Sequence, residues 1–180
     1  MPSTEPRLRF AAPLRWMHWT VFALVLLAYV CVNVFDLFPK GSLTRANVLA
    51  SHFTAGLAVL LLVLPRLLLR LRHGRPPVSP PPARWTERLG NLTHVALYLF
   101  LLVQPLLGVI TLQVAGKPVV LFGMTLLPVF YAPANRALSH RLEDLHGTIG
   151  TVFYYVIALH ILAALWHHFG RRDNTLQRML

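Results

Sequence analysis

The sequence predicts an all-α membrane protein, a four-transmembrane-helix bundle with both termini in the cytoplasm. The chain of 180 residues is 56% hydrophobic and only 13% charged, which fits an integral membrane protein and neither a soluble domain nor a disordered chain. Each of its four uncharged runs reaches the roughly 20 residues that a helix needs to cross a bilayer; they cover residues 16–35, 46–65, 89–116 and 145–170. We expect a single domain over residues 1–180, with helices at about 14–36, 46–71, 89–113 and 143–169.

The basic residues indicate how these helices are oriented. Twelve of the 17 lysines and arginines lie in the N-terminal segment, the second connection or the C-terminal tail, and five lie in the other two connections. The positive-inside rule therefore predicts cytoplasmic termini, in a multi-pass membrane protein. Because membrane sorting accounts for the net charge of +11, we expect membrane lipid as a partner and no nucleic acid.

The first helix opens with Arg15-Trp16-Met17-His18-Trp19, in which the tryptophans suit the membrane interface. His18 lies near the cytoplasmic surface, either as a cofactor ligand or as an interfacial histidine bonded to headgroups. The single cysteine, Cys31, lies in mid-span and has no partner for an intramolecular disulfide. We interpret Cys31 as a packing residue.

The second helix carries His52 near its periplasmic start and Arg66 fourteen residues later. Fourteen residues are close to a whole number of helical turns, so both side chains share one face. Such a face suits a haem ligand near one membrane surface and an arginine for the propionates of a second haem near the other. The alternative is that Arg66 extends to lipid phosphate.

The third helix follows an extended, proline-rich cytoplasmic connector at residues 74–88. It carries His94 near the cytoplasmic side, and fourteen residues later the chain has Gly108. We therefore do not expect His94 to be a ligand and consider it a candidate contact to a cofactor or quinone. The long periplasmic connection after this helix contains an apolar stretch, residues 121–128, which is too short to span and is expected to cover the bundle as a lid.

The fourth helix carries His146 and His160, fourteen residues apart. One face therefore holds two imidazoles about 21 Å apart along the axis, one near each membrane surface. Imidazole within a membrane usually faces the bundle interior and has a partner, so two cofactors are predicted, each needing one more ligand. His167, seven residues after His160, lies on nearly the same face as a candidate contact to a propionate or quinone, or as a solvated histidine in a basic tail.

Depth in the membrane sorts the remaining ligands. His18 and His160 fall toward the cytoplasmic side, and His52 and His146 toward the periplasmic side. Two imidazoles on opposite faces of a porphyrin give a six-coordinate iron, which favours electron transfer over oxygen binding. Zinc or copper is the competing interpretation, but no thiolate or carboxylate accompanies these histidines and each site has only two ligands. Two haems are therefore favoured.

Several segments together resemble the bacterial cytochrome b561 family, in particular its small di-haem members that include superoxide oxidase. The resemblance covers nearly the whole chain, and the tail is its most specific part. The matching segments are Arg15–Trp19, Ala50–His52, Arg66–Leu71, Leu145–Gly147, Ala158–His160, His167–His168 and Arg172–Met179.

The resemblance implies that His18, His52, His146 and His160 are the axial ligands to the iron of two b haems. It also implies oxidation of superoxide to dioxygen at the periplasmic haem and reduction of ubiquinone near the cytoplasmic haem. Basic residues on the periplasmic side would attract a small anion, although ordinary loop charges are the simpler interpretation; they are Lys40, Arg45, Lys117, Arg136 and Arg141.

The preferred function is thus an oxidoreductase of the superoxide:quinone type. One alternative is a non-enzymatic electron relay or membrane anchor for another redox protein. A second is a histidine-lined transporter of metal ions or protons, which would contain no haem.

Overall fold

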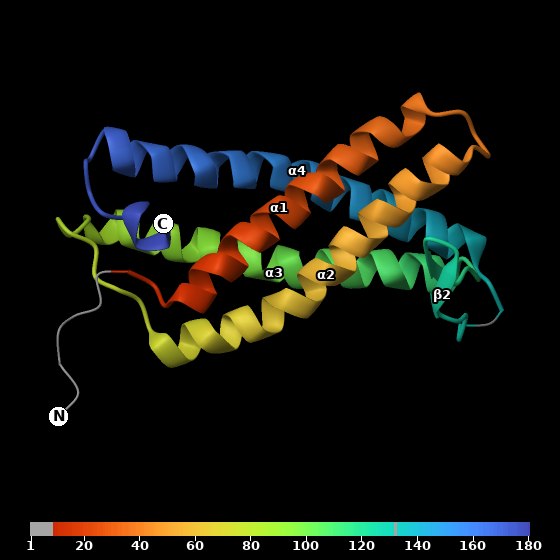
Figure 1. Ribbon diagram of the computed structural model, residues 1–180, viewed down its shortest axis with the longest axis horizontal. Helices are drawn as coiled ribbons and strands as arrows, with labels where there is room; N and C mark the ends of the chain where they lie inside the picture. Colours follow the sequence, from red (N-terminus) through yellow and green to blue (C-terminus); the bar gives the residue numbers. More distant parts are fainter. Residues whose placement is uncertain (1–8, 132) are drawn as a thin grey trace.

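The computed structural model describes residues 9–131 and 133–180, and most of its regular structure is helical. Four long helices, α1 (Ala12–Val34), α2 (Leu43–His73), α3 (Arg84–Val114) and α4 (Arg136–Phe169), run along the length of the molecule (Figure 1). Each is long and apolar enough to cross a membrane. This confirms the prediction of an all-α protein with four transmembrane helices.

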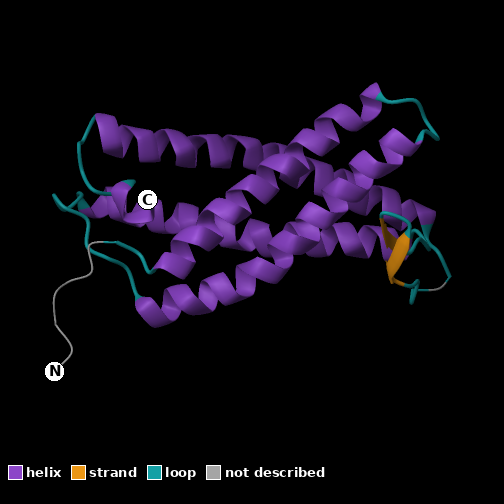
Figure 2. Cartoon of the chain, viewed as in Figure 1, coloured by secondary structure: helices purple, strands orange, loops and turns teal. Residues whose placement is uncertain are grey.

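The connections gather at the two ends of the bundle. The start of α1, the α2–α3 connection and the tail with its short helix η2 (Gln177–Met179) lie at one end, which we name the termini end (Figure 1). The other end, the hairpin end, holds the short helix η1 (Phe35–Leu37) and the antiparallel strands β1 (Val119–Leu121) and β2 (Met124–Leu127) (Figure 2).

Local sequence explains where the helices begin and end. Proline in the first turn starts α1. The side chains of Ser42 and Asn135 cap α2 and α4 by accepting hydrogen bonds from the backbone N–H groups of Arg45 and Leu138. Gly74, with φ of 68°, ends α2. α3 and α4 begin at Arg84 and Arg136, ahead of the uncharged stretches; the cap at Asn135 accounts for the early start of α4, whereas α3 begins after Ala83 without a side-chain cap.

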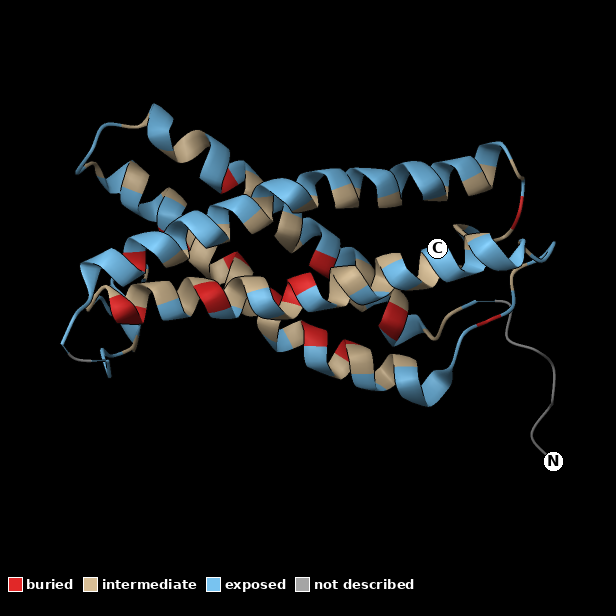
Figure 3. Cartoon of the chain, turned by 180° about the vertical axis from the view of Figure 1, so that it is seen from behind, coloured by how far each residue is buried: buried red, intermediate tan, exposed pale blue. Residues whose placement is uncertain are grey.

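The helices pack as two pairs. α1 packs along α2 and α3 along α4, and α2 joins the pairs by packing against α3, so that the pairs cross (Figure 1). The core at the crossing comes from α1, α2 and α3 and consists of Val21, Val59, Val63, Phe100 and Leu101. In α4, Ser139 is the one fully buried residue, and Figure 3 shows this helix as mostly exposed or half-buried.

Long side chains connect α1 to α4. The Tyr29 hydroxyl of α1 donates to the carbonyl oxygen of Gly150 in α4 over 2.8 Å, and its ring lies 4.1 Å from that of Tyr154, between centroids. The stacked rings of Phe100 and Phe153, also 4.1 Å apart, fasten α3 to α4. α4 is therefore joined to α1 of the other pair as well as to α3 of its own pair.

Candidate functional site

At the hairpin end, His52 of α2 and His146 of α4 face each other across the two helix pairs. Their ring centroids are 6.3 Å apart and their planes are inclined by 76°. The Nδ1 atom of His52 lies 2.9 Å from the carbonyl oxygen of Ala28, which can only accept. Nδ1 therefore carries the proton and Nε2 keeps its lone pair, the state in which histidine binds a metal.

The position of His146 is set by its neighbours on α3. The Gln104 side-chain amide donates to the backbone carbonyl of His146 over 2.8 Å. A Cβ atom at Gly108 would lie 3.4 Å from Cε1 of the His146 ring, so glycine lets the imidazole lie close to the α3 backbone. The sequence pattern had singled out Gly108 only as the place where a further histidine is lacking.

At the termini end, each of the four helices contributes a polar group. Nη2 of Arg66 donates to Nδ1 of His18 over 3.1 Å, joining α2 to α1. The rings of His94 and His160 lie 5.5 Å apart between centroids, joining α3 to α4. His94 therefore lies against the predicted ligand His160, and the pairing of His18 with His160 stays a prediction.

Arg66 is buried in the bundle, with 8% of its surface exposed. Its guanidinium carbon lies 5.1 Å from the centroid of the Tyr98 ring, and that of Arg70 lies 5.3 Å from the same ring. Nε of Arg66 has no hydrogen-bond partner, and neither have Nδ1 of His94 and the Tyr98 hydroxyl. A buried guanidinium needs an anion or several acceptors to offset its lost hydration, so this cluster suits an acidic group of a bound molecule.

His167 is held by the tail through a residue that the sequence pattern did not indicate. Its Nδ1 lies 2.6 Å from Oδ2 of Asp173, whose side chain is fully buried, and Oδ1 of Asp173 accepts from the backbone N–H of Thr175 over 2.9 Å. Burial raises the pKa of this carboxyl, but the hydrogen bonds from His167 and Thr175 outweigh it and hold the pKa below its ordinary value. The sequence offered one indication of this pairing: Asp173 is a single acidic residue in a basic tail, six residues after His167.

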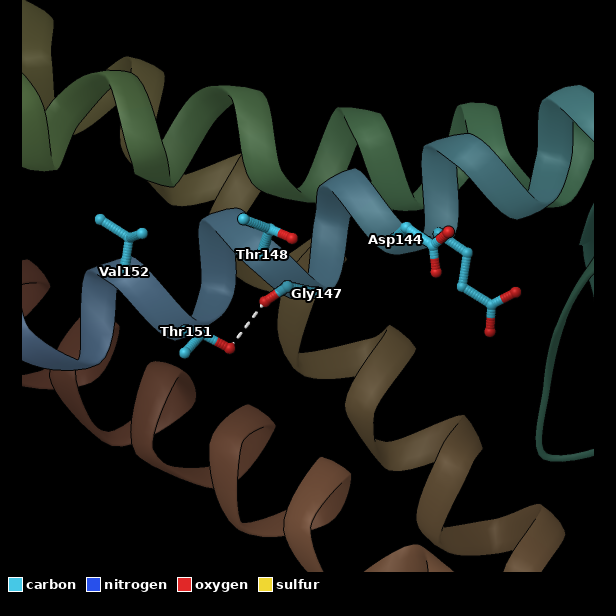
Figure 4. Close-up of a pocket in the computed structure, with 6 residues that line it drawn as sticks. Asp144, Gly147, Thr148, Thr151 and Val152 are labelled. Atoms are coloured by element: carbon cyan, nitrogen blue, oxygen red, sulfur yellow. Dashed lines mark hydrogen bonds between the residues drawn. The ribbon is translucent and has the colours of Figure 1, made fainter.

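An open hollow of about 580 Å³ lies on α4, lined by residues on another side of the helix from His146. Its lining is carboxylates and small side chains, shown in Figure 4: Glu143, Asp144, Gly147, Thr148, Thr151 and Val152. The Thr151 hydroxyl is turned back onto the Gly147 carbonyl, to which it donates over 2.9 Å. The two carboxylates give this hollow a negative charge.

Comparison with known proteins identifies the family. The family described as prokaryotic cytochrome b561 matches residues 9–180. The chain belongs to that family. It is 34% identical to "Cytochrome b561 homolog 1" of Escherichia coli K12 over 96% of this chain and 97% of that protein. It is also 33% identical to "Probable superoxide oxidase CybB" of Yersinia pestis over 91% of each.

The resemblance proposed from sequence is therefore confirmed, and the protein is a multi-pass membrane cytochrome that transfers electrons through b-type haem. The geometry of His52 and His146 fits such a group. Metal–imidazole bonds are about 2.0 Å long, so two rings on opposite sides of one iron have centroids roughly 6 Å apart, close to the 6.3 Å found. Within residues 9–131 and 133–180, no three histidine, cysteine or acidic side chains converge as a metal cluster, and haem iron needs only two.

Asp173 gives a testable prediction about stability. Replacement by asparagine should lower the stability of the cytochrome in detergent at pH 7 by about 1.5–3 kcal/mol, the usual contribution of hydrogen bonds to a charged group. Because the folded pKa is below the ordinary value, this contribution is complete above about pH 4 and disappears as pH falls through the folded pKa. Thermal unfolding of the unchanged protein and of the variant, at pH 7 and again below the folded pKa of Asp173, measures this contribution. As the control, Asp36→Asn removes an exposed carboxylate that pairs with Arg45 and should cost under about 1 kcal/mol; equal losses in the two variants would contradict the prediction.

Proposed function

We propose that this cytochrome holds two b haems and transfers electrons from a donor at the hairpin end to a quinone at the termini end. The facing pair of His52 and His146 carries the proposal. When bound, the haems would supply one-electron carriers near each membrane surface, with His18 and His160 as the second pair of ligands. The excess of lysine and arginine at the termini end supports cytoplasmic termini and an inner-membrane location.

Arg66 would serve the haem at the termini end through its propionates. In the structure its guanidinium donates to Nδ1 of His18, which places the imidazole proton on Nε2. For His18 to bind iron through Nε2, Nδ1 must take that proton and Arg66 must turn to another acceptor. A propionate carboxylate is such an acceptor, and the burial of Arg66 favours it over lipid phosphate.

A quinone at the termini end would lie near His94 and His167. His94 packs against His160, and His167 is fixed by the buried carboxylate of Asp173. Reduction of one ubiquinone to ubiquinol takes two electrons and two protons, and an imidazole oriented by a carboxylate can hold and deliver a proton. Lipid contact for His94 is not favoured, because its Nδ1 is buried.

For the donor, we infer superoxide, each ion losing one electron to become dioxygen so that two reduce one quinone. The name of the Yersinia pestis relative supports this. Lysines and arginines at the hairpin end would attract the anion, although Arg45 is paired with Asp36 over 2.7 Å. Glu143 and Asp144, which precede His146 in α4, would repel it.

These opposed charges make the superoxide step testable. In liposomes containing ubiquinone, an enzymatic source of superoxide should produce ubiquinol and reduce the haem. The double variant Glu143→Gln, Asp144→Asn should react several-fold faster at low salt, with a smaller gain at high salt, because repulsion of the anion from the hairpin end is removed and salt screens this repulsion.

The matched control is Glu87→Gln, which removes a carboxylate from the first turn of α3 at the termini end and should leave the rate unchanged. Haem that is reduced slowly by superoxide, with no gain in the double variant, would contradict this donor. Such a result would favour an electron relay or anchor for another redox protein.

A further inference from the structure

Hydrogen bonds and packing hold the β1–β2 hairpin against the helix bundle. Gln113, buried at the end of α3, donates to the carbonyl oxygen of Pro128 over 3.2 Å and accepts from the N–H of Phe130 over 3.0 Å. Val119 of β1 is 1% exposed, and β1 packs against α2 and α3. The hairpin therefore has a fixed inner side, and its outer side chains have a defined direction.

The hairpin and the segment after it carry exposed apolar side chains, which we name the hairpin patch: Phe122, Met124, Leu126, Phe130 and Tyr131. Met124 and Phe130 are 72% and 68% exposed. Residues 114–142 contain no aspartate or glutamate, and their charged side chains are all basic. So many exposed large apolar side chains within residues 122–131 are unusual against water and indicate a partner.

We propose that the hairpin patch lies in the headgroup region of the bilayer and contacts the lipid of the leaflet at the hairpin end. Figure 1 shows β2 beside the ends of α3 and α4, no farther along the molecule than the α1–α2 connection. The patch is thus at the depth of the helix ends, and Ile110, about one turn before the end of α3, is exposed as well. Aromatic and basic residues are enriched at this depth.

The hairpin backbone fixes the depth more closely. A two-stranded hairpin leaves the outer N–H and C=O groups of both strands unpaired by backbone, and these groups cannot enter hydrocarbon. Headgroups and water can satisfy them while the side chains of β2 reach the acyl boundary. The hairpin therefore acts as a shallow lipid anchor that holds the α3–α4 connection against the membrane surface. This role is independent of the electron donor.

Spin labels on single cysteines test this anchor in liposomes of phosphatidylcholine and phosphatidylglycerol. In a Cys31→Ser background, the labelled variants are Met124→Cys, Leu126→Cys and Phe130→Cys, studied one at a time; Phe122 is avoided because its φ is 48° and a cysteine there would be strained. Leu61→Cys, 76% exposed in mid-span, serves as the lipid reference, and Lys40→Cys in the α1–α2 connection as the water reference.

The ratio of collisions with oxygen to collisions with a water-soluble nickel complex should be highest at position 61 and lowest at position 40. Labels on the patch should give an intermediate ratio, as expected at the acyl boundary. Helical circular dichroism and haem content of each variant establish folding. Nickel collisions like those at position 40 would overturn the proposal and leave the patch free for a soluble protein. Exclusion of both reagents would also overturn it, because the patch would then be covered by chain or cofactor.

Discussion

Replacing His146 by alanine should remove one of two b haems from the purified protein. The ring of His146 faces that of His52 at a distance suited to one iron between them, and loss of either ligand leaves that iron one axial bond short. The reduced pyridine adduct should fall from two haems per chain to about one, and His52→Ala should give the same loss.

Double variants test which histidines share an iron. His52→Ala with His146→Ala should lose no more haem than either single change, because both belong to one site. His146→Ala with His18→Ala should lose both haems. Full haem in three of the four single variants would show that the ligand assignment is wrong.

His94→Ala is the most informative control for the proposed pairing of His18 with His160, because the ring of His94 lies against that of His160. Under the proposed pairing His94→Ala keeps both haems, and so does His140→Ala, which changes an exposed side chain at the start of α4. Haem loss in His94→Ala together with full haem in His18→Ala would assign His94 as the partner of His160.

Replacing Arg66 by leucine should weaken binding of the haem at the termini end by about 10²–10³-fold. The guanidinium is buried, and removing one partner of a buried ion pair costs about 3–5 kcal/mol because the other charge is left unpaired. Haem retained after transfer to a haem-free scavenger protein measures the change, and the haem between His52 and His146 should be kept.

The matched control is Arg72→Leu, which removes an exposed arginine one and a half turns farther along α2. It should retain both haems. Arg66→Lys keeps the charge but lacks the two-pronged geometry that suits a carboxylate, so an intermediate loss is expected. Equal haem retention in all three variants would show that Arg66 serves lipid and not a cofactor.

Features that depend on the length of an apolar run or on the spacing of residues along one helix could be predicted from the sequence. The four spans followed from uncharged runs, and the shared face of His146 and His160 followed from helical spacing, since both are local properties of one segment. Contacts between segments could not be predicted in this way. The proximity of His94 to His160 depends on how α3 lies against α4, and the bond from Asp173 to His167 depends on how the tail folds back.

The apolar stretch at 121–128 shows a further limit. Its length excluded a transmembrane helix, but the pairing of β1 with β2 depends on a turn at Phe122 and Gly123, both with positive φ. The pairing of β1 with β2 is also irregular between Val119 and Val120. A pattern of alternating apolar residues does not reveal such an irregularity. Burial of Gln113 beneath it likewise reflects the hairpin and not helix α3 alone.

The division of the bundle into two helix pairs has a consequence for biogenesis. Each pair is a helical hairpin that the insertion machinery can place in the membrane by itself, and the core at their crossing is small. His52 and His146 belong to different pairs, as do His18 and His160, so each haem would join the pairs together. Haem supply would then set the rate at which newly inserted chains mature, and chains made during haem shortage would remain open to quality-control proteases.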